Sequence, residues 1–330
     1  MYKEKTMMFL YAETPIHPGA GSGAGFIDLP VQRERFTGLP IFQASGIKGA
    51  MREYFESQTS GPQNEILDAF GPDTARAAEH AGALGVSEAK ILLFPVRSLY
   101  GVFAYLTCPL VLQRFKRDLE LVGHVPTLWP ATIPTPTGET VFVISTRDGS
   151  GTIIARGPNV NDLKAVFDEY AFSARPSPET RQIAEFIRDH AFPTSGEYIN
   201  WKNQFPGRFA IVPDDVFLDF TRLGAEVLTR NRIDDNTGTV EEGALWTEEH
   251  LPSETFLYSV LLAADPMTDT SKRPKALADG SAVLNFVKAG LTRSGLSISG
   301  LDNRRLQIGG DQTLGRGIVM ARFLSKEGGP

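Results

Sequence analysis

The stretch HPGAGSGAGFIDLPVQRERFTGLPIFQASGIKGAMRE, residues 17–53, poses the first question about the fold. Its first four glycines, at 19, 21, 23 and 25, alternate with small residues, an acid follows at Asp28, and a helical pattern begins only near Ser45. A glycine run after a strand suits two tasks, because glycine has no Cβ: it binds a nucleotide, or it lets another chain's backbone pass close by. The elements on either side of the stretch decide between them.

These flanking segments predict an α+β fold. The apolar run TMMFLYAET predicts a buried strand that ends at Pro15, and Ser45 is a candidate N-cap for a helix with one apolar face. Strand patterns at 90–96 and 102–108 follow, and then a helix with Pro109 at its first position. The order strand, helix, strand, strand, helix is a ferredoxin-like unit that lacks one strand.

The apolar run at 256–265 supplies the missing strand. We therefore predict a single domain over residues 1–330, with a core at about 1–121 and 256–330 and a long insertion at about 122–255. Clusters of proline and glycine break the insertion into irregular pieces, so we expect no long element there.

The first glycine run matches G-x-G-x-x-A at 19–24, which is formally a dinucleotide fingerprint. Pro30 and Pro40 interrupt the chain before any helix pattern, so no helix N-terminus would face a pyrophosphate. This context disfavours a dinucleotide-dependent oxidoreductase. A nicotinamide titration without signal would remove that alternative.

A second glycine-rich loop, IGGDQTLGRG at 308–317, predicts a phosphate-contacting surface instead. It brings backbone amides and a guanidinium together, and it can lie beside the first loop if the sheet is ferredoxin-like. The helix start near residue 45 adds amides and cations. The residues that we assign to this phosphate-contacting surface are Ser45, Lys48, Arg52, Gly309, Gly310, Gly315, Arg316 and Gly317.

Composition limits the class of protein. A net charge of −6 argues against a protein that coats nucleic acid through a basic surface, although a local basic groove remains compatible with it. The single cysteine, Cys108, excludes an internal disulfide, and the five histidines show no metal-ligand spacing. No apolar run approaches the roughly 20 residues of a membrane span, and MYKEKTMMFLYAE is too short for a signal peptide. We expect a cytoplasmic protein with no membrane partner.

The quoted stretch, the segment RNRIDDNTGTVEEGALWTEEHLPSETFLYS and the terminal IGGDQTLGRGIV strongly resemble the RAMP-superfamily backbone subunits of type III-B CRISPR (Cmr) effector complexes. The resemblance covers both ends and the insertion, in order. It implies a modified RRM-like fold, a β-hairpin thumb at about 205–250, and copies of the chain in a filament with guide RNA and other Cmr subunits. It also implies cleavage of complementary single-stranded target RNA at regular intervals.

Carried over residue by residue, the resemblance makes Asp28 the catalytic acid and the ligand of a divalent metal, magnesium or manganese. His17 becomes a second candidate catalytic residue, and Glu248 or Glu249 a weaker one. Without the resemblance, Asp28 before Leu-Pro reads as a turn residue. His17, before a Pro-Gly turn, reads equally as a structural residue or as one that assists proton transfer. The alternative function, from a different class, is a scaffold subunit that binds guide RNA and cuts nothing.

Overall fold

The computed structural model describes residues 2–23, 25–61, 63–73, 78–124, 129–144, 151–157, 162–268 and 275–325. Its helices are α1 Ala44–Glu56, α2 Asn64–Phe70, α3 Pro109–Leu121, α4 Pro178–His190, α5 Ile199–Arg208, α6 Asp214–Leu223 and α7 Gly280–Ala289. Its strands are β1 Glu4–Ala12, β2 Ile41–Phe42, β3 Leu84–Val86, β4 Ala89–Arg97, β5 Phe103–Thr107, β6 Thr140–Val143, β7 Ala155–Arg156, β8 Leu163–Phe167, β9 Tyr170–Pro176, β10 Phe209–Ile211, β11 Glu226–Ile233, β12 Val240–His250, β13 Phe256–Ala263, β14 Gly290–Arg293, β15 Leu296–Ser299, β16 Arg304–Gln307 and β17 Ile318–Phe323.

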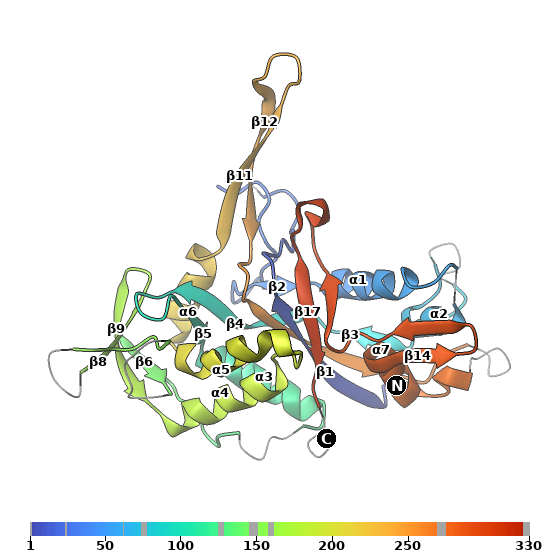
Figure 1. Ribbon diagram of the computed structural model, residues 1–330, viewed down its shortest axis with the longest axis horizontal. Coiled ribbons are helices and arrows are strands. Elements are labelled where there is room, and N and C mark those ends of the chain that lie inside the picture. Colours follow the sequence, from blue (N-terminus) through green and yellow to red (C-terminus); the bar gives the residue numbers. More distant parts are fainter. Residues whose placement is uncertain are drawn as a thin grey trace.

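Most of these strands form one mixed sheet, in the order β16-β17-β1-β13-β4-β5-β10-β6-β9-β8-β7. The pairs β11–β12 and β14–β15 are separate hairpins. Figure 1 shows that the β11–β12 hairpin projects away from the rest of the molecule. An α+β architecture with a large sheet is therefore confirmed.

The predicted first strand is β1, which lies between two antiparallel neighbours, β13 and β17. Its residues from Thr6 to Ala12 are all buried. Because both faces of the strand are covered, its sequence is continuously apolar instead of alternating. The strand predicted at 256–265 is β13, and it pairs with both β1 and β4.

The helix predicted from Pro109 is α3, and the predicted apolar face is the buried one. Phe115, at the centre of that face, is fully buried. Its ring centroid lies 6.0 Å from that of Phe9 on β1 and 5.0 Å from that of Tyr258 on β13. Helix α3 is therefore fixed to the sheet by aromatic packing, which contributes several kcal/mol for a side chain of this size, about 3–5 in Phe-to-Ala substitutions.

Two local predictions are wrong. The first helical residue of α1 is Ala44, and its N-cap is Gln43, which makes no side-chain cap hydrogen bond. Ser45 therefore lies inside the first turn, where it is exposed. The insertion is also more regular than predicted, because it holds the 13-residue helix α4 and the 11-residue strand β12. Strand β10 of the insertion even joins the main sheet, between β5 and β6.

Candidate functional site

The segments on either side of the first glycine loop are hydrogen-bonded to the free edge of β12, at the base of the β11–β12 hairpin. Strand β12 pairs with β11 on one side. On its other side, Leu29 donates its N–H to the Thr247 carbonyl and accepts from the Glu249 N–H, both at 3.0 Å. Ile16 exchanges a similar pair of backbone bonds with Leu251, at 2.8 and 2.9 Å. The two ends of the glycine run are thus fastened to one strand, and the residues between them form a loop over it.

Asp28 lies at the end of this loop with an exposed side chain. Its Oδ2 accepts hydrogen bonds from the Thr247 N–H at 2.8 Å and from the Thr247 hydroxyl at 2.9 Å. These bonds, the backbone one first, lower the pKa of Asp28 below its usual value. Its Oδ1 has no hydrogen-bond partner within the described part of the chain. Asp28 is therefore an ionised, oriented carboxylate with one oxygen directed away from its protein partner.

His17, at the start of the same loop, is held in one tautomer. Its Nδ1 lies 2.7 Å from the Glu249 carbonyl oxygen. A carbonyl only accepts, so Nδ1 carries the proton, and in the neutral ring Nε2 keeps its lone pair. A Cβ on Gly19 would lie 2.8 Å from this Nε2, so the glycine leaves room for it. The imidazole is competent to accept a proton over the glycine loop.

The two glycine-rich loops lie side by side, as predicted. Gly310 donates its N–H to the His17 carbonyl at 3.1 Å, and Gly317 donates to the Pro15 carbonyl at 2.8 Å. A Cβ on Gly309 would approach the His17 carbonyl oxygen to 2.5 Å, and its φ is +79°. Glycine is therefore required at 309 by the first loop's backbone.

The second loop uses most of its glycine amides internally, which the sequence analysis did not expect. Gly310, Gly315 and Gly317 all donate to backbone carbonyls of the protein. Of the four glycines, Gly309 keeps an N–H without an acceptor among the residues that the structure describes. The Arg316 guanidinium forms an ion pair with Glu226 of β11 at 3.6 Å. The prediction that this loop presents several free amides to a phosphate is therefore wrong.

The three residues predicted on α1 lie near this junction but differ in availability. Ser45 is exposed. Lys48 donates to the Leu84 carbonyl at 2.7 Å, and burial, followed by the nearby Arg52 charge, lowers its pKa. Arg52 pairs with Glu56 at 2.7 Å. The structure thus places both predicted cations in contacts within the chain.

A polar cluster that sequence reasoning missed joins the hairpin to the second loop. Arg230 Nη1 of β11 lies 2.7 Å from Glu248 Oε2 and 2.9 Å from Asp311 Oδ1. Asp311 also accepts from the fully buried His250, whose Nε2 lies 3.1 Å from Oδ2. Burial lowers the pKa of His250. The hydrogen bond with Asp311 raises this pKa, but it offsets the effect of burial only in part. Burial disfavours the Asp311 anion, but the bonds from Arg230 and His250 outweigh it and lower its pKa.

Glu248, His250 and Asp311 have ligand atoms within 4.8 Å of one another, close enough for a metal ion. Arg230 already supplies the positive charge that both carboxylates need. The carboxylates therefore form an ion-pair network that fastens the hairpin to the second loop, while Nδ1 of the buried His250 has no partner among the described residues. Asp28 lies outside this group.

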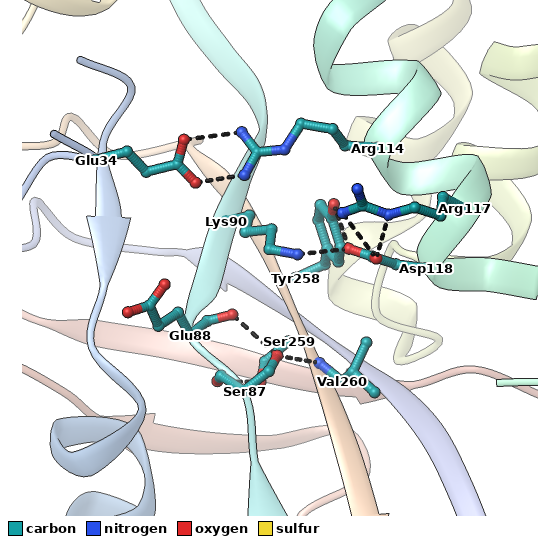
Figure 2. Close-up of polar contacts among 10 residues, drawn as sticks. All are labelled: Glu34, Ser87, Glu88, Lys90, Arg114, Arg117, Asp118, Tyr258, Ser259 and Val260. Atoms are coloured by element: carbon teal, nitrogen blue, oxygen red, sulfur yellow. Dashed lines mark hydrogen bonds and ion pairs between the residues drawn. The ribbon is translucent and has the colours of Figure 1, made fainter. Parts of the chain in front are cut away.

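Glu249, the other weak candidate, anchors the segment after Asp28. Its Oε1 pairs with Arg33, and its Oε2 accepts from the Val31 N–H at 2.9 Å. Further along, Glu34 forms a bidentate pair with Arg114 of α3, which Figure 2 shows beside the Lys90–Asp118 pair. Two buried carboxylates thus connect the Asp28 loop to the hairpin and to the core.

The comparisons with known proteins agree with this architecture. The model of the RAMP superfamily matches residues 9–319. A relative described as a Cmr endoribonuclease, Cmr4 of Pyrococcus furiosus, is 38% identical over 310 residues, which cover 94% of this chain and 92% of the relative. The Cmr4 subunit of Saccharolobus solfataricus is 25% identical, with 96% of each chain covered. A crystal structure of oligomeric Cmr4 from Pyrococcus furiosus matches with a TM-score of 0.66 and 31% identity, covering 97% of this chain and 98% of that one.

The chain belongs to the RAMP superfamily. Within it, the chain is a homologue of Cmr4, a backbone subunit of type III-B Cmr complexes. In the part of the chain that the structure describes, no helix is both long and apolar enough to span a membrane.

Proposed function

We propose that this chain binds guide RNA as a repeated subunit of a type III-B CRISPR ribonucleoprotein and cleaves the complementary single-stranded target RNA with Asp28. The relative from Pyrococcus furiosus is named an endoribonuclease, and a Cmr4 structure from the same organism is oligomeric. Guide RNA, target RNA, further copies of the chain and other Cmr subunits are the partners in this proposal.

The observation that carries the proposal is the Asp28 carboxylate. It is ionised, exposed, oriented from the hairpin, and open at Oδ1. A carboxylate held only to close a turn would have no need of fixation by a strand 219 residues away in the sequence. The His17 imidazole, whose Nδ1 donates to the Glu249 carbonyl, lies at the other end of the same loop.

RNA supplies its own nucleophile, so the protein needs to provide geometry and charge more than covalent chemistry. The target 2′-hydroxyl gives its proton to His17 Nε2, and its oxygen attacks the adjacent phosphorus. The bond from phosphorus to the 5′ oxygen breaks, and that oxygen takes up a proton. The products are a 2′,3′-cyclic phosphate and a 5′-hydroxyl.

Divalent-metal dependence is part of the proposal, with magnesium or manganese as the ion. A carboxylate oxygen without a protein partner suits a hard cation that keeps most of its water, and Asp28 Oδ1 is such an oxygen. The ion would relieve negative charge at the attacked phosphate. Asp28 is the residue that would hold it.

We assign the RNA surface to the junction of the two glycine loops and the α1 start. Ser45 and the Gly309 amide are the groups there that are open to an RNA phosphate. Lys48, Arg52 and Arg316 would contact RNA only after exchanging protein partners for phosphate. Gly310 contributes by letting the two loops approach, because a Cβ there would lie 3.2 Å from the His17 ring. Gly315 and Gly317 contribute the positive φ angles of the second loop.

We propose further that β1, β4, β5, β13, α1 and α3 form a ferredoxin-like core and that the β11–β12 hairpin is the thumb. Val227 and Leu245 lie on the same face of the hairpin and are 51% and 62% exposed. Exposed apolar residues on an isolated hairpin favour a partner that covers them. A distorted guide–target duplex fits that requirement.

The scaffold alternative keeps one observation in its favour. The bonds between Asp28 and Thr247 also fasten the glycine loop to β12, and a subunit that only binds RNA would use them for that purpose. Both functions predict a repeated footprint on guide RNA. They differ only in whether cuts appear at the same spacing.

The test is cleavage of an end-labelled, guide-matched RNA by complexes assembled with the wild-type chain or with Asp28→Ala, with and without magnesium. Target binding is measured separately. We expect the ladder to vanish in the variant and in the absence of metal, while binding persists. An unchanged ladder with Asp28→Ala would remove the nuclease assignment of this residue.

A further inference from the structure

The contact between Asp28 and Thr247 is reciprocal. Thr247 donates its backbone N–H and its hydroxyl to the same oxygen, Oδ2. In return, the Asp28 N–H donates to the Thr247 hydroxyl oxygen at 3.0 Å. The hydroxyl therefore accepts from the backbone of Asp28 and donates to its carboxylate, which fixes the rotamers of both side chains.

The orientation of the carboxylate follows from this arrangement. With Oδ2 committed to two donors, Oδ1 is the oxygen left for an external ligand. Thr247 belongs to β12, so the carboxylate is oriented by the projecting hairpin and not by its own loop. Thr247 is only half-buried, so its side chain contributes little to the core.

We propose that Thr247 is a positioning residue for the cleavage reaction: its hydroxyl holds the Asp28 carboxylate with Oδ1 directed toward the RNA. This inference rests on the proposed function of Asp28. It assigns to the hairpin a role beyond contact with RNA, because any shift of β12 moves the carboxylate with it.

The charged groups on the packed elements, Glu248, Glu249 and Arg33, are committed to ion pairs of their own. The hydroxyl of Thr247 is therefore the feature to remove.

The chain offers a matched control. Thr229 of β11 is the direct cross-strand partner of Thr247 and lies on the same face of the hairpin, where it is exposed. Thr229→Val makes the same chemical change at the same depth of the hairpin without touching Asp28. Thr247→Ser keeps the hydroxyl and serves as the rescue.

Two readouts are needed. The first is the single-turnover cleavage rate in the assembled complex, with target affinity measured alongside. We expect Thr247→Val and Thr247→Ala to slow cleavage about tenfold, the usual cost of losing a residue that orients a functional carboxylate. Thr247→Ser and Thr229→Val should stay within about twofold of wild type, with target affinity unchanged throughout.

The second readout is cleavage by Asp28→Ala in the same assembled complex. Undiminished cleavage by Asp28→Ala would show that Asp28 does not catalyse, so the proposed function would fail. Undiminished cleavage by Thr247→Val where Asp28→Ala abolishes it, or equal slowing by Thr229→Val, would overturn the positioning role itself.

Discussion

The two glycine-rich loops have similar compositions but differ in how closely their central glycines are packed. In the first loop, a Cβ on Gly21 or Gly25 would meet nothing within 4 Å, and Phe26 is fully exposed. In the second, a Cβ on Gly309 or Gly317 would come within 2.5 or 2.0 Å of a backbone oxygen. At these positions glycine gives the first loop open space and the second loop close packing, whereas Gly19 and Gly23 are packed and Gly315 is open.

This difference separates two uses of glycine that a sequence pattern does not distinguish. The open loop ends in Asp28 and presents its surface to solvent, which suits a loop that receives a substrate. The packed loop, residues 308–317, donates most of its glycine amides to carbonyls of the protein. It is the surface against which His17 and the hairpin pack. The comparison can be tested by substitutions that add one methyl group.

The largest effect is expected for Gly317→Ala. The new Cβ would lie 2.0 Å from the Ile308 carbonyl oxygen, at a φ of +76° that disfavours any residue with a Cβ. We expect the free energy of unfolding to fall by about 3 kcal/mol, from overpacking and left-handed strain together. Gly25→Ala, in open space, should change it by less than about 0.5 kcal/mol. Urea denaturation of the two variants measures both values, and equal losses would contradict the contrast between the loops.

Much of the core was predictable because its patterns are local. The continuous apolar run of β1 and the helical spacing of Phe115 and its neighbours need only a few adjacent residues to be recognised. The start of α1 was placed too late because Gln43 caps it without a side-chain bond, so Ser45 gave a misleading signal. The regular elements of the insertion were missed because proline begins α4 at its first turn instead of interrupting it.

Substitution of Glu249, which anchors the segment after the open loop to β12, should give the next largest loss of stability. Glu249 is almost fully buried and accepts from Arg33 and from the Val31 N–H. In Glu249→Gln, an amide replaces an acceptor, so one of these donors loses its partner, at a cost of about 2 kcal/mol. Cleavage should slow because the segment after Asp28 loosens.

The control for this substitution is Glu242→Gln, on the same strand, where the side chain is exposed. Thermal unfolding should distinguish the two variants. A Glu249→Gln protein as stable as Glu242→Gln would mean that the open loop does not depend on β12 for its order.

The site itself was predictable only in part. Asp28 and His17 were predicted through a family resemblance; the structure brings both onto the free edge of β12, and their catalytic roles stay a prediction. Thr247, Arg230 and Asp311 were missed because their partners are far away in the sequence. No local period relates position 28 to position 247, so only the folded chain reveals that pair.

The smallest expected effect is a pH dependence of stability that arises from His250, which packs against the second loop. Because burial lowers the pKa of His250 below 6.5, the folded state binds a proton less readily than the unfolded state. Stability should therefore fall as the pH drops below about 6.5, and the groups facing His250, namely Asp311, Arg316 and His17, modulate this fall. In His250→Gln, which cannot gain charge, the melting temperature should decline less steeply between pH 7 and 5. His80→Gln, at a half-buried histidine outside this cluster, is the control for the substitution itself. Equal slopes of melting temperature against pH in both variants would mean that His250 has the same pKa in the folded and unfolded chain. The packed loop would then be more accessible to solvent than its contacts indicate.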